Sequence, residues 1–353
     1  MHVDTHLETG ILAEAPAAAR LAETIGFDGI WTPETKHNPF LPLTLIAEHS
    51  SRLICGTSIA IAFARSPMVL ANIAWDLQAY SQGRFVLGLG TQVKGHNERR
   101  FSVKWESPGP RMREVILALR AIWDCWQHGT PLRFQGRYYT FTLMTPFFNP
   151  GPIAHPHIPI HIAAINPYMC RLVGELCDGI RLHSFNSRRY TEEVILPNIR
   201  AGAEKAGRSP DDIAICGGGF IITGATSEEI EQEKEKVRQR IAFYASTRTY
   251  KPILDIHGWG ETCLILHQMA ARGEWEAMAG QITDEMLEAF AVWGTYDEIA
   301  EKVWERYGGV VDRVVLPFPR TPEAQEAMQD VVQALKSRAE RGTHRPASDS
   351  RGS

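Results

Sequence analysis

Two residues that could handle a proton, Glu34 and His37, stand close together just after the apolar run Ile30-Trp31-Thr32. A carboxylate can act as a general acid or base, and an imidazole can donate a hydrogen bond to a reacting group. If the run before them is a strand of an α/β barrel, both side chains would lie at the catalytic face. The alternative is a surface loop in which Glu34 pairs with Lys36, and the spacing alone does not separate the two.

A second set of residues could hold a phosphate. The apolar run Phe85–Leu89 contains Gly88 and leads into Gly90 and Thr91. Glycine lets backbone N–H groups approach an anion closely because it has no Cβ, and the threonine hydroxyl adds a donor. The dinucleotide fingerprint G-x-G-x-x-G is incomplete here, because its third glycine is missing and no helix opens at once.

The turn Ala163-Ala164-Ile165-Asn166 before Pro167 is a third candidate. Small residues followed by proline at a helix start leave backbone N–H groups free, and the positive end of the helix dipole favours an anion. If this turn and Thr91 follow neighbouring strands, they could hold one phosphate together. A routine turn between strand and helix is the alternative.

Three histidines, His155, His157 and His161, suggest a metal site, but the pattern does not support one. Two of them lie in a proline-rich segment, no cysteine or carboxylate joins them, and their spacing matches no familiar zinc site. We therefore expect no metal. A G-x-S-x-G motif is absent as well, so a serine hydrolase of the α/β type is not indicated.

The elements that must position these residues alternate between helix and strand. Helical segments end in turns at Gly26–Gly29, Asp178-Gly179 and Gly308-Gly309 and pass at once into short apolar or β-branched runs. Such units predict eight strands, near residues 2–6, 29–33, 54–61, 85–89, 159–164, 179–183, 213–223 and 310–316. Strands alternating with helices form a parallel sheet, and eight units favour a closed (β/α)8 TIM barrel.

We expect a single barrel domain over residues 1–320, with two insertions over its carboxyl-terminal face. The first, at about 129–158, contains a hairpin around Gly136, and the second, at about 247–293, contains short helices. A C-terminal helix at 321–342 and a disordered polar tail at 343–353 complete the prediction.

The composition limits the partners. The chain has 353 residues and a net charge of −4, so nucleic acid and anionic membranes are not expected partners. Its six cysteines form no C-x-x-C pair, and we find neither a secretory signal nor an apolar run of the ~20 residues that span a bilayer. A reduced, cytoplasmic protein with a small-molecule substrate is the expectation.

Several motifs, in order and spacing, resemble the bacterial luciferase-like superfamily, over about residues 3 to 320. They are Gly-Phe-Asp-Gly-Ile-Trp leading into Glu34, Leu-Ile-Cys-Gly-Thr-Ser-Ile, the Ser-Pro helix start, and the run Gly83–Thr91. Within the superfamily, the chain is most similar to oxidoreductases that use the deazaflavin coenzyme F420.

The resemblance implies that a tricyclic redox ring lies at the carboxyl ends of the strands. A bulge in the third strand with a cis non-proline peptide would back the ring, here at Ser58-Ile59. The cofactor phosphate would rest on Gly90, Thr91 and the turn at 163–166, and Asn97 matches a helix start that faces the cofactor tail in relatives.

The acid/base position of the F420 relatives matches Glu34. Many relatives place histidine directly after it, whereas Thr35 stands there in this chain. His37, His96 and His183 could take that role; we assign His37 to catalysis with Glu34, and His183 to the cofactor site.

The resemblance implies hydride transfer between F420 and a small organic substrate. We expect the substrate to be fairly apolar, because five aromatic residues stand near predicted loop ends: Phe63, Trp105, Phe147, Phe148 and Phe185. One alternative is an FMN-dependent monooxygenase that uses reduced flavin and dioxygen and is supplied by a cofactor reductase. Another is a non-catalytic cofactor-binding protein. A homodimer is expected on family grounds.

Overall fold

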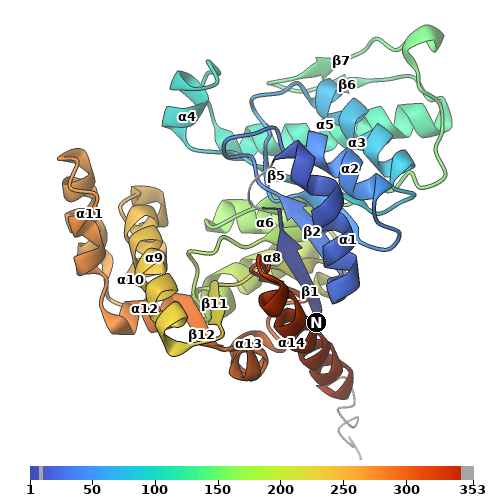
Figure 1. Ribbon diagram of the computed structural model, residues 1–353. Coiled ribbons are helices and arrows are strands. Elements are labelled where there is room, and N and C mark those ends of the chain that lie inside the picture. Colours follow the sequence, from blue (N-terminus) through green and yellow to red (C-terminus); the bar gives the residue numbers. More distant parts are fainter. Residues whose placement is uncertain (8–10, 343–353) are drawn as a thin grey trace, which may run out of the picture.

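Eight parallel strand positions close into a barrel in the computed structural model, which describes residues 1–7 and 11–342 (Figure 1). Around the barrel, the strands are β1 (His2–His6), β2 (Gly29–Thr32), β3 (Ile54–Thr57) continued by β4 (Ala60–Ile61), β5 (Phe85–Gly90), β8 (Ile160–Ala163), β9 (Gly179–Arg181), β10 (Ala214–Cys216) and β13 (Arg313–Leu316). Because β13 pairs with β1, the sheet has no free edge. The predicted (β/α)8 barrel is confirmed; the predicted disordered tail lies outside the described residues.

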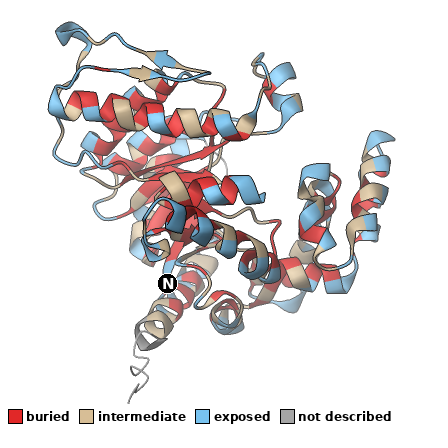
Figure 2. Ribbon diagram, turned by 180° about the vertical axis from the view of Figure 1, so that it is seen from behind, coloured by how far each residue is buried: buried red, intermediate tan, exposed pale blue. Residues whose placement is uncertain are grey.

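Helices cover the outside of the barrel. They are α1 (Ala15–Ile25), α2 (Leu41–Glu48), α3 (Pro67–Tyr80), α5 (Pro108–His128), α6 (Pro167–Leu176), α8 (Leu196–Lys205), α13 (Tyr296–Tyr307) and α14 (Pro322–Gly342). Helix α3 begins where expected, because the Ser66 side chain accepts a hydrogen bond from the Met68 N–H. Figure 2 shows that burial is concentrated in the strands and in the helix faces that pack on them.

The aspartates before three strands fix the pairing of those strands. Each side chain accepts a backbone N–H from the neighbouring strand, which joins Asp28 to Val3, Asp178 to Ile160 and Asp312 to Ile215 at 2.8, 2.7 and 2.7 Å. A charge-assisted bond of this kind is stronger than one between neutral groups. These aspartates, two of which stand in the turns noted in the sequence, therefore set the register of the sheet.

The interior of the barrel is filled by Trp31 and by charged groups. Trp31 is fully buried, and its indole N–H donates to Asp4 at 2.8 Å. Arg313 donates two hydrogen bonds to the same carboxylate, at 2.8 and 2.6 Å. Gly56 leaves room for the indole, since a Cβ at this position would come within 2.7 Å of the ring. The first and last strands are thus joined by a buried ion pair under one large aromatic ring.

The single strand predicted at 213–223 is wrong, because the segment forms two strands. Gly217, Gly218 and Gly219 interrupt it, and Gly217 has a φ of 111°, which side chains rarely adopt. The second half is β11 (Phe220–Gly224), which leaves the barrel and pairs in parallel with β12 (Ala291–Thr295), a strand that the sequence analysis missed.

Strands β11 and β12 support a helical lobe beside the barrel (Figure 1). Its helices are α9 (Ser227–Ala245), α10 (Lys251–Asp255), α11 (Gly260–Ala271) and α12 (Asp284–Phe290). The lobe therefore begins before the insertion predicted at about 247–293, and it contains the short helices expected there.

The remaining elements are short. The predicted hairpin is β6 (Phe134–Gln135) with β7 (Thr140–Phe141), and α4 (Lys94–Arg99), α7 (Arg188–Tyr190) and the π-helical turn at Thr191–Ile195 flank the barrel strands. Single 3-10 turns lie at Leu12–Glu14, Pro146–Phe148, Pro210–Asp212, Arg248–Tyr250 and Ala277–Gln281. Among the described helices, none is both long enough and apolar enough to cross a lipid bilayer.

The substitution Asp178→Asn tests the role of the acidic turns. We expect the free energy of unfolding at pH 7 to fall by about 1–3 kcal/mol, because the charge-assisted bonds to Arg120 and the Ile160 N–H are lost. Burial alone would raise the pKa of Asp178, but the His157 hydrogen bond, the Arg120 charge and the Ile160 N–H together lower it to about 2.

The effect of this substitution should depend on pH. A carboxyl whose pKa is lower in the folded state stabilises fully above its ordinary value of 3.8, and the contribution is lost as the pH falls toward 2. Denaturant titrations of wild type and variant between pH 7 and pH 2.5 should therefore show a difference that shrinks with acid. A difference that stays constant over this range would show that the ionised Asp178 carboxylate does not stabilise the fold.

Candidate active site at the carboxyl ends of the barrel strands

A bulge in the third barrel strand forms the floor of the site. The peptide bond between Ser58 and Ile59 is cis, as the resemblance implied, and it separates β3 from β4. Both residues are partly exposed, whereas Thr57 and Ala60 on either side are fully buried. The bulge therefore presents its surface at the mouth of the barrel and is anchored on both sides in the core.

The two glycines of β5 make room for this bulge. A Cβ at Gly88 would come within 1.9 Å of the Thr57 carbonyl oxygen, and one at Gly90 within 2.4 Å of the Ile59 side chain. The Thr57 hydroxyl also donates to the Gly88 carbonyl at 2.6 Å and accepts the Gly88 N–H at 3.0 Å. Close packing against the bulge thus gives the Gly-x-Gly pattern a role that does not depend on a phosphate.

Glu34 forms a two-point ion pair with Arg65, which the sequence analysis did not anticipate. Its carboxylate accepts from Arg65 at 2.7 and 2.8 Å and from the Ile61 N–H at 2.7 Å, and the side chain is only 7% exposed. The Glu34 N–H donates to the Ile59 carbonyl at 3.3 Å. Glu34 is therefore at the bulge, as a catalytic role requires, but both of its oxygens already accept hydrogen bonds.

His37 lies in a different environment from Glu34. Its side chain is exposed and lines a small hollow together with Ile11, Leu12 and Leu41. Lys36, which could have paired with Glu34, is exposed as well. The structure shows no contact that brings His37 to the Glu34 carboxylate among the described residues.

The two segments expected to hold a phosphate do end neighbouring strands. Strands β5 and β8 pair in parallel, with Leu89 opposite Ile162, so Gly90-Thr91 and Ala163-Ala164 leave the barrel side by side. Asn166 caps α6, because its side chain accepts the Met169 N–H at 3.0 Å. Ala164 is buried, while Thr91, Ala163 and Ile165 are partly exposed.

Asn97 holds α4 against the end of β5. It is fully buried, and its side-chain amide donates to the carbonyl oxygens of Thr91 and Val93 at 2.9 and 3.1 Å. Its own Oδ1 has no hydrogen-bond partner. Asn97 therefore holds the backbone of Thr91 and Val93 in place through hydrogen bonds to their carbonyl oxygens.

His183 follows β9 and sits among aromatic rings. Its ring centroid lies 4.4 Å from that of Tyr244 and 5.0 Å from that of Tyr250. Burial lowers the pKa of His183 to about 4, so the ring is neutral at pH 7. Because its Nδ1 accepts the Phe185 N–H at 2.9 Å, the proton resides on Nε2, where it can be donated.

Several buried polar atoms at the mouth have no partner. They are His6 Nε2, Asn97 Oδ1, Arg181 Nη1 and Asn186 Oδ1. All four belong to residues that end a barrel strand or lie in the segment after one. Unpaired buried polar groups are costly, and four of the seven found among the described residues lie here, as a ligand site would show; the other three are Trp126 Nε1, Tyr138 OH and Thr223 Oγ1. The sequence analysis missed His6 and Arg181, although each is the last residue of a predicted strand or close to it.

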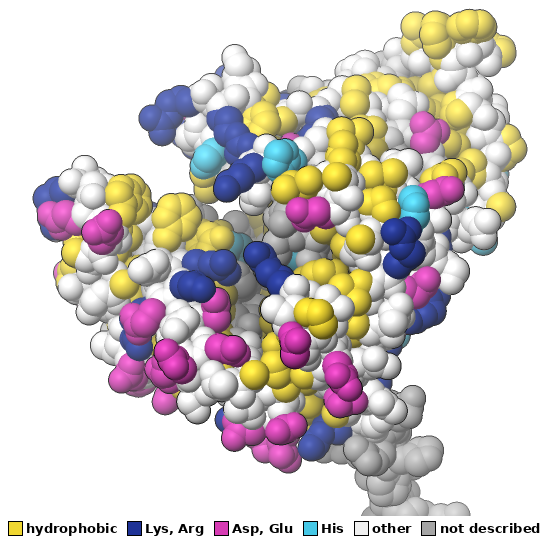
Figure 3. Space-filling view, in the orientation of Figure 1, with side chains coloured by type: hydrophobic (Ala, Val, Ile, Leu, Met, Phe, Trp, Pro, Cys, Tyr) yellow, Lys and Arg dark blue, Asp and Glu magenta, His cyan; other side chains and the backbone are white. Residues whose placement is uncertain are grey.

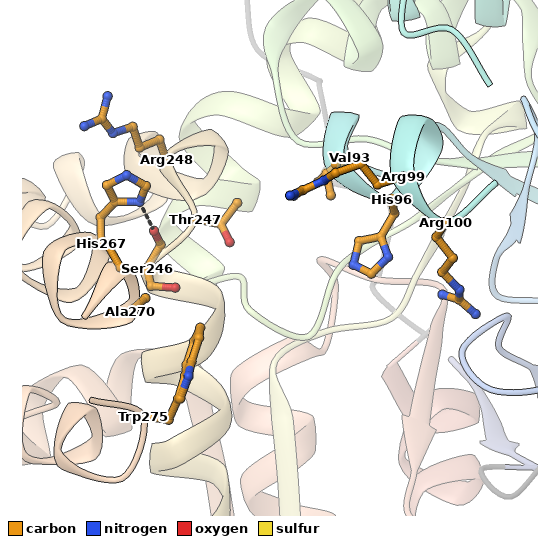
Figure 4. A pocket seen from close by; sticks show the side chains of 12 residues that line it. Val93, His96, Arg99, Arg100, Ser246, Thr247, Arg248, His267, Ala270 and Trp275 are labelled. Atoms are coloured by element: carbon orange, nitrogen blue, oxygen red, sulfur yellow. Dashed lines mark hydrogen bonds between the residues drawn. The ribbon is translucent and has the colours of Figure 1, made fainter. Parts of the chain in front are cut away.

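A cleft of about 840 Å³ opens between α4 and the helical lobe, and we call it the cationic cleft (Figures 3 and 4). One wall carries His96, Arg99 and Arg100; the other carries Thr247, Arg248, His267 and Trp275. Figure 4 shows His96 and Arg99 on the α4 side facing Thr247 across the gap. In the part of the chain that the structure describes, no acidic residue lines this cleft.

The cationic cleft adjoins the barrel mouth. Helix α4 is fixed to the end of β5 through Asn97, and Arg100 donates to the Thr35 carbonyl oxygen in the loop after β2. On the other wall, Tyr244 and Tyr250, which flank the segment at 246–248, pack on His183. A ligand at the mouth could therefore extend into a region of positive charge.

Comparison with known proteins identifies a family. The model of the luciferase-like monooxygenase family matches residues 1–313. An uncharacterised protein of Mycobacterium tuberculosis is 49% identical over 307 residues, which cover 87% of this chain and 90% of that protein. A 5,10-methylenetetrahydromethanopterin reductase of Archaeoglobus fulgidus is 28% identical over 320 residues, covering 88% and 91%.

The fold also matches a solved structure over nearly its whole length. The coenzyme F420 dependent tetrahydromethanopterin reductase from Methanopyrus kandleri superposes with a TM-score of 0.77 at 21% identity, covering 96% of this chain and 99% of that one.

The substitution Gly90→Ala tests the packing of β5 on the bulge. We expect the free energy of unfolding to fall by about 1–3 kcal/mol, because the added methyl group meets the Ile59 side chain. Gly280→Ala is the matched control, since a Cβ there meets nothing within 4 Å. Denaturant titration gives both values, and equal stability of the two variants would show that Gly90 is not needed for packing.

Proposed function

Because the chain belongs to the luciferase-like monooxygenase family, we propose that it is an oxidoreductase that transfers a hydride between coenzyme F420 and a small organic substrate. The observation that carries the proposal is the Ser58-Ile59 bulge at a barrel mouth that opens into the cationic cleft. Similarity to methylenetetrahydromethanopterin reductases over most of the chain supports the same class of chemistry.

The residues at the mouth fit such a cofactor. The bulge offers a firm, partly exposed surface for a flat ring, and four polar atoms buried behind the mouth have no hydrogen-bond partner among the described residues. Gly90, Thr91 and the turn at 163–166 would hold the phosphate, whose charge suits the positive end of the α6 dipole; the Met169 N–H of that helix is already capped by Asn166. When bound, the deazaflavin supplies or accepts the hydride at a ring carbon.

The cationic cleft favours F420 over FMN. Coenzyme F420 carries carboxylates beyond its phosphate, in an oligoglutamate tail, whereas FMN ends at the phosphate. Within the described residues, no carboxylate forms an ion pair with Arg99, Arg100 or Arg248. An FMN-dependent monooxygenase would leave these three guanidinium groups without a ligand role. FMN remains the second candidate, because the family name describes monooxygenases.

The protein's own side chains would position the substrate against the ring, exclude water and handle one proton. Arg65 holds Glu34 against the Ile61 N–H and so fixes the bulge. For Glu34 to exchange a proton, one of its two bonds to Arg65 must open. His183 is a neutral donor through Nε2, which suits it to polarise a carbonyl or imine without giving up its proton. Trp105 is partly exposed beside the buried ring of Phe63, with the ring centroids 6.2 Å apart, and it supports an apolar substrate.

The cofactor assignment is tested by titrating the protein with F420 and with FMN and following fluorescence. We expect F420 to bind at least about tenfold more tightly, a difference of ~1.4 kcal/mol. Anaerobic incubation of bound, reduced F420 with alcohols, enones and imines then tests hydride transfer. Tight binding of FMN with no binding of F420 would overturn the assignment, and tight binding without transfer to any substrate would favour a carrier protein.

The double substitution Arg99→Ala with Arg248→Ala tests the cationic cleft. We expect the Kd of F420 to rise about tenfold in low salt, because two charge contacts to the tail are lost. The Kd of the riboflavin-like deazaflavin that lacks phosphate and tail should not change. Lys94→Ala is the control, since Lys94 is an exposed cation of α4 that does not line the cleft. Equal losses for both ligands would exclude tail binding.

The substitution Glu34→Gln tests the proton-handling role. If Glu34 exchanges the proton, we expect turnover to fall by ~10²–10⁴-fold with little change in cofactor Kd. Arg65→Met is the comparison, because it keeps the carboxylate and removes the ion pair. Should both variants weaken cofactor binding and leave turnover of the bound form intact, the pair would be positioning the bulge only.

A further inference from the structure

The charges inside the barrel do not balance. Asp4 and Arg181 are enclosed by the strands, at 0% and 3% exposure, and Arg313, whose side chain is 13% exposed, reaches Asp4 from the first residue of β13. One carboxylate therefore faces two guanidinium groups. A buried charge without a counter-ion is costly, so an excess of one positive charge calls for a partner.

The Asp4 carboxylate already accepts hydrogen bonds on both of its oxygens. It accepts two hydrogen bonds from Arg313 and one from the Trp31 indole, at 2.6 to 2.8 Å. Arg181 instead lies over the Trp31 ring, with its guanidinium carbon 3.7 Å from the ring centroid. Among the described residues, no carboxylate comes within ion-pair distance of Arg181, and its Nη1 has no partner.

The other titratable groups around Arg181 add no charge near neutral pH. Burial, followed by the Arg181 charge, lowers the pKa of His6 to about 4 and that of His161 to about 3. Burial raises the pKa of Cys216 to about 11, although Arg181 opposes the shift. All three are therefore neutral between pH 6 and pH 9, and Glu34 is paired with Arg65. The excess positive charge of the interior persists over this range.

Arg181 lies at the level of the bulge. It is the last residue of β9, opposite Ala163 of β8, and its Nε–H donates to the Ser58 hydroxyl at 3.3 Å. Since Ser58 is partly exposed at the mouth, the guanidinium is directly beneath the surface that the bulge presents. Its charge acts through a dry, low-dielectric layer, where electrostatic effects are much stronger than in water.

We propose that Arg181 supplies the buried positive charge that stabilises the anionic form of the redox ring bound over the Ser58-Ile59 bulge. The proposal rests on the proposed function, because it requires such a ring at the mouth. In this role Arg181 is a positioning residue: it places a positive charge beneath the ring and does not itself exchange a proton. The ligand class is a planar heterocycle that ionises near neutral pH, and oxidised F420 belongs to this class through its phenolic hydroxyl.

The experiment follows the ionisation of F420 bound to the full chain. Loss of the phenolic proton changes the absorption spectrum of the ring, so a pH titration between 5 and 9 gives the pKa of the bound and the free cofactor. We expect the pKa of the bound ring to be lower than that of the free ring by about one unit, a tenfold shift of the ionisation constant. In Arg181→Met, the bound pKa should return to the free value or exceed it, whereas Arg181→Lys should keep it low.

Arg84→Met is the matched control. Arg84 precedes β5 at the opposite end of the barrel, and its guanidinium donates to the Leu53, Ala47 and Ser50 carbonyl oxygens, with no carboxylate partner in the described chain. Its removal should leave the bound pKa unchanged. A bound pKa in Arg181→Met equal to that of wild type would overturn the proposal. If this variant does not fold, an unshifted pKa in the wild-type complex overturns it equally.

Failure of the proposed function gives a different result. If the folded wild type binds no F420, the F420 assignment fails, and reduced FMN replaces it as the probe, since its ring also ionises near neutral pH. The same comparison of Arg181→Met with Arg181→Lys then applies. Binding of neither ring would overturn both proposals.

Discussion

The barrel depends on one buried carboxylate, Asp4, which joins the first strand to the last. Arg313 is 309 residues away along the chain, yet its two donors meet both oxygens of Asp4. Removing one partner of a buried pair typically costs about 3–5 kcal/mol, because the remaining charge is left uncompensated. Here the third donor, the Trp31 indole, satisfies the carboxylate further, so the ion pair and the aromatic ring hold each other in place.

The surface of the candidate active site is built on this interior. Trp31 fills the space that Gly56 leaves, Arg181 lies on the face of its ring, and the Ser58 hydroxyl accepts from Arg181. Each of these groups limits the positions open to the next one toward the mouth. The bulge is then fixed from the side by the glycines of β5 and by the Glu34–Arg65 pair. A ring bound there would meet a surface that is already organised, which reduces the cost of ordering it on binding.

Much of the fold could be predicted from the sequence, because its signals are local. The acidic turns at Asp28 and Asp178 mark strand starts, and their side chains do bond to the neighbouring strand. The contact of Glu34 with Arg65 could not be predicted in this way, since it joins residues 31 apart and exists only once the bulge has formed. The run at 213–223 was misleading because both of its halves are apolar, although the glycines at 217–219 mark the break.

The positions of charged groups in the fold could not be predicted from the sequence either. A net charge of −4 does not indicate where the positive groups lie. In the sequence, nothing distinguishes Arg181 from an exposed arginine at the end of a strand. The fold places positive charge at two depths: Arg181 is beneath the bulge, and Arg99, Arg100 and Arg248 lie in the outer cleft. The outer group is hydrated and screened by salt, so it can attract an anionic ligand from a distance but adds little selectivity. The inner charge is shielded from water, so it distinguishes a ring that carries negative charge from one that does not. A ligand with a charged tail and an ionisable ring would use both regions, and the proposed cofactor F420 is such a ligand.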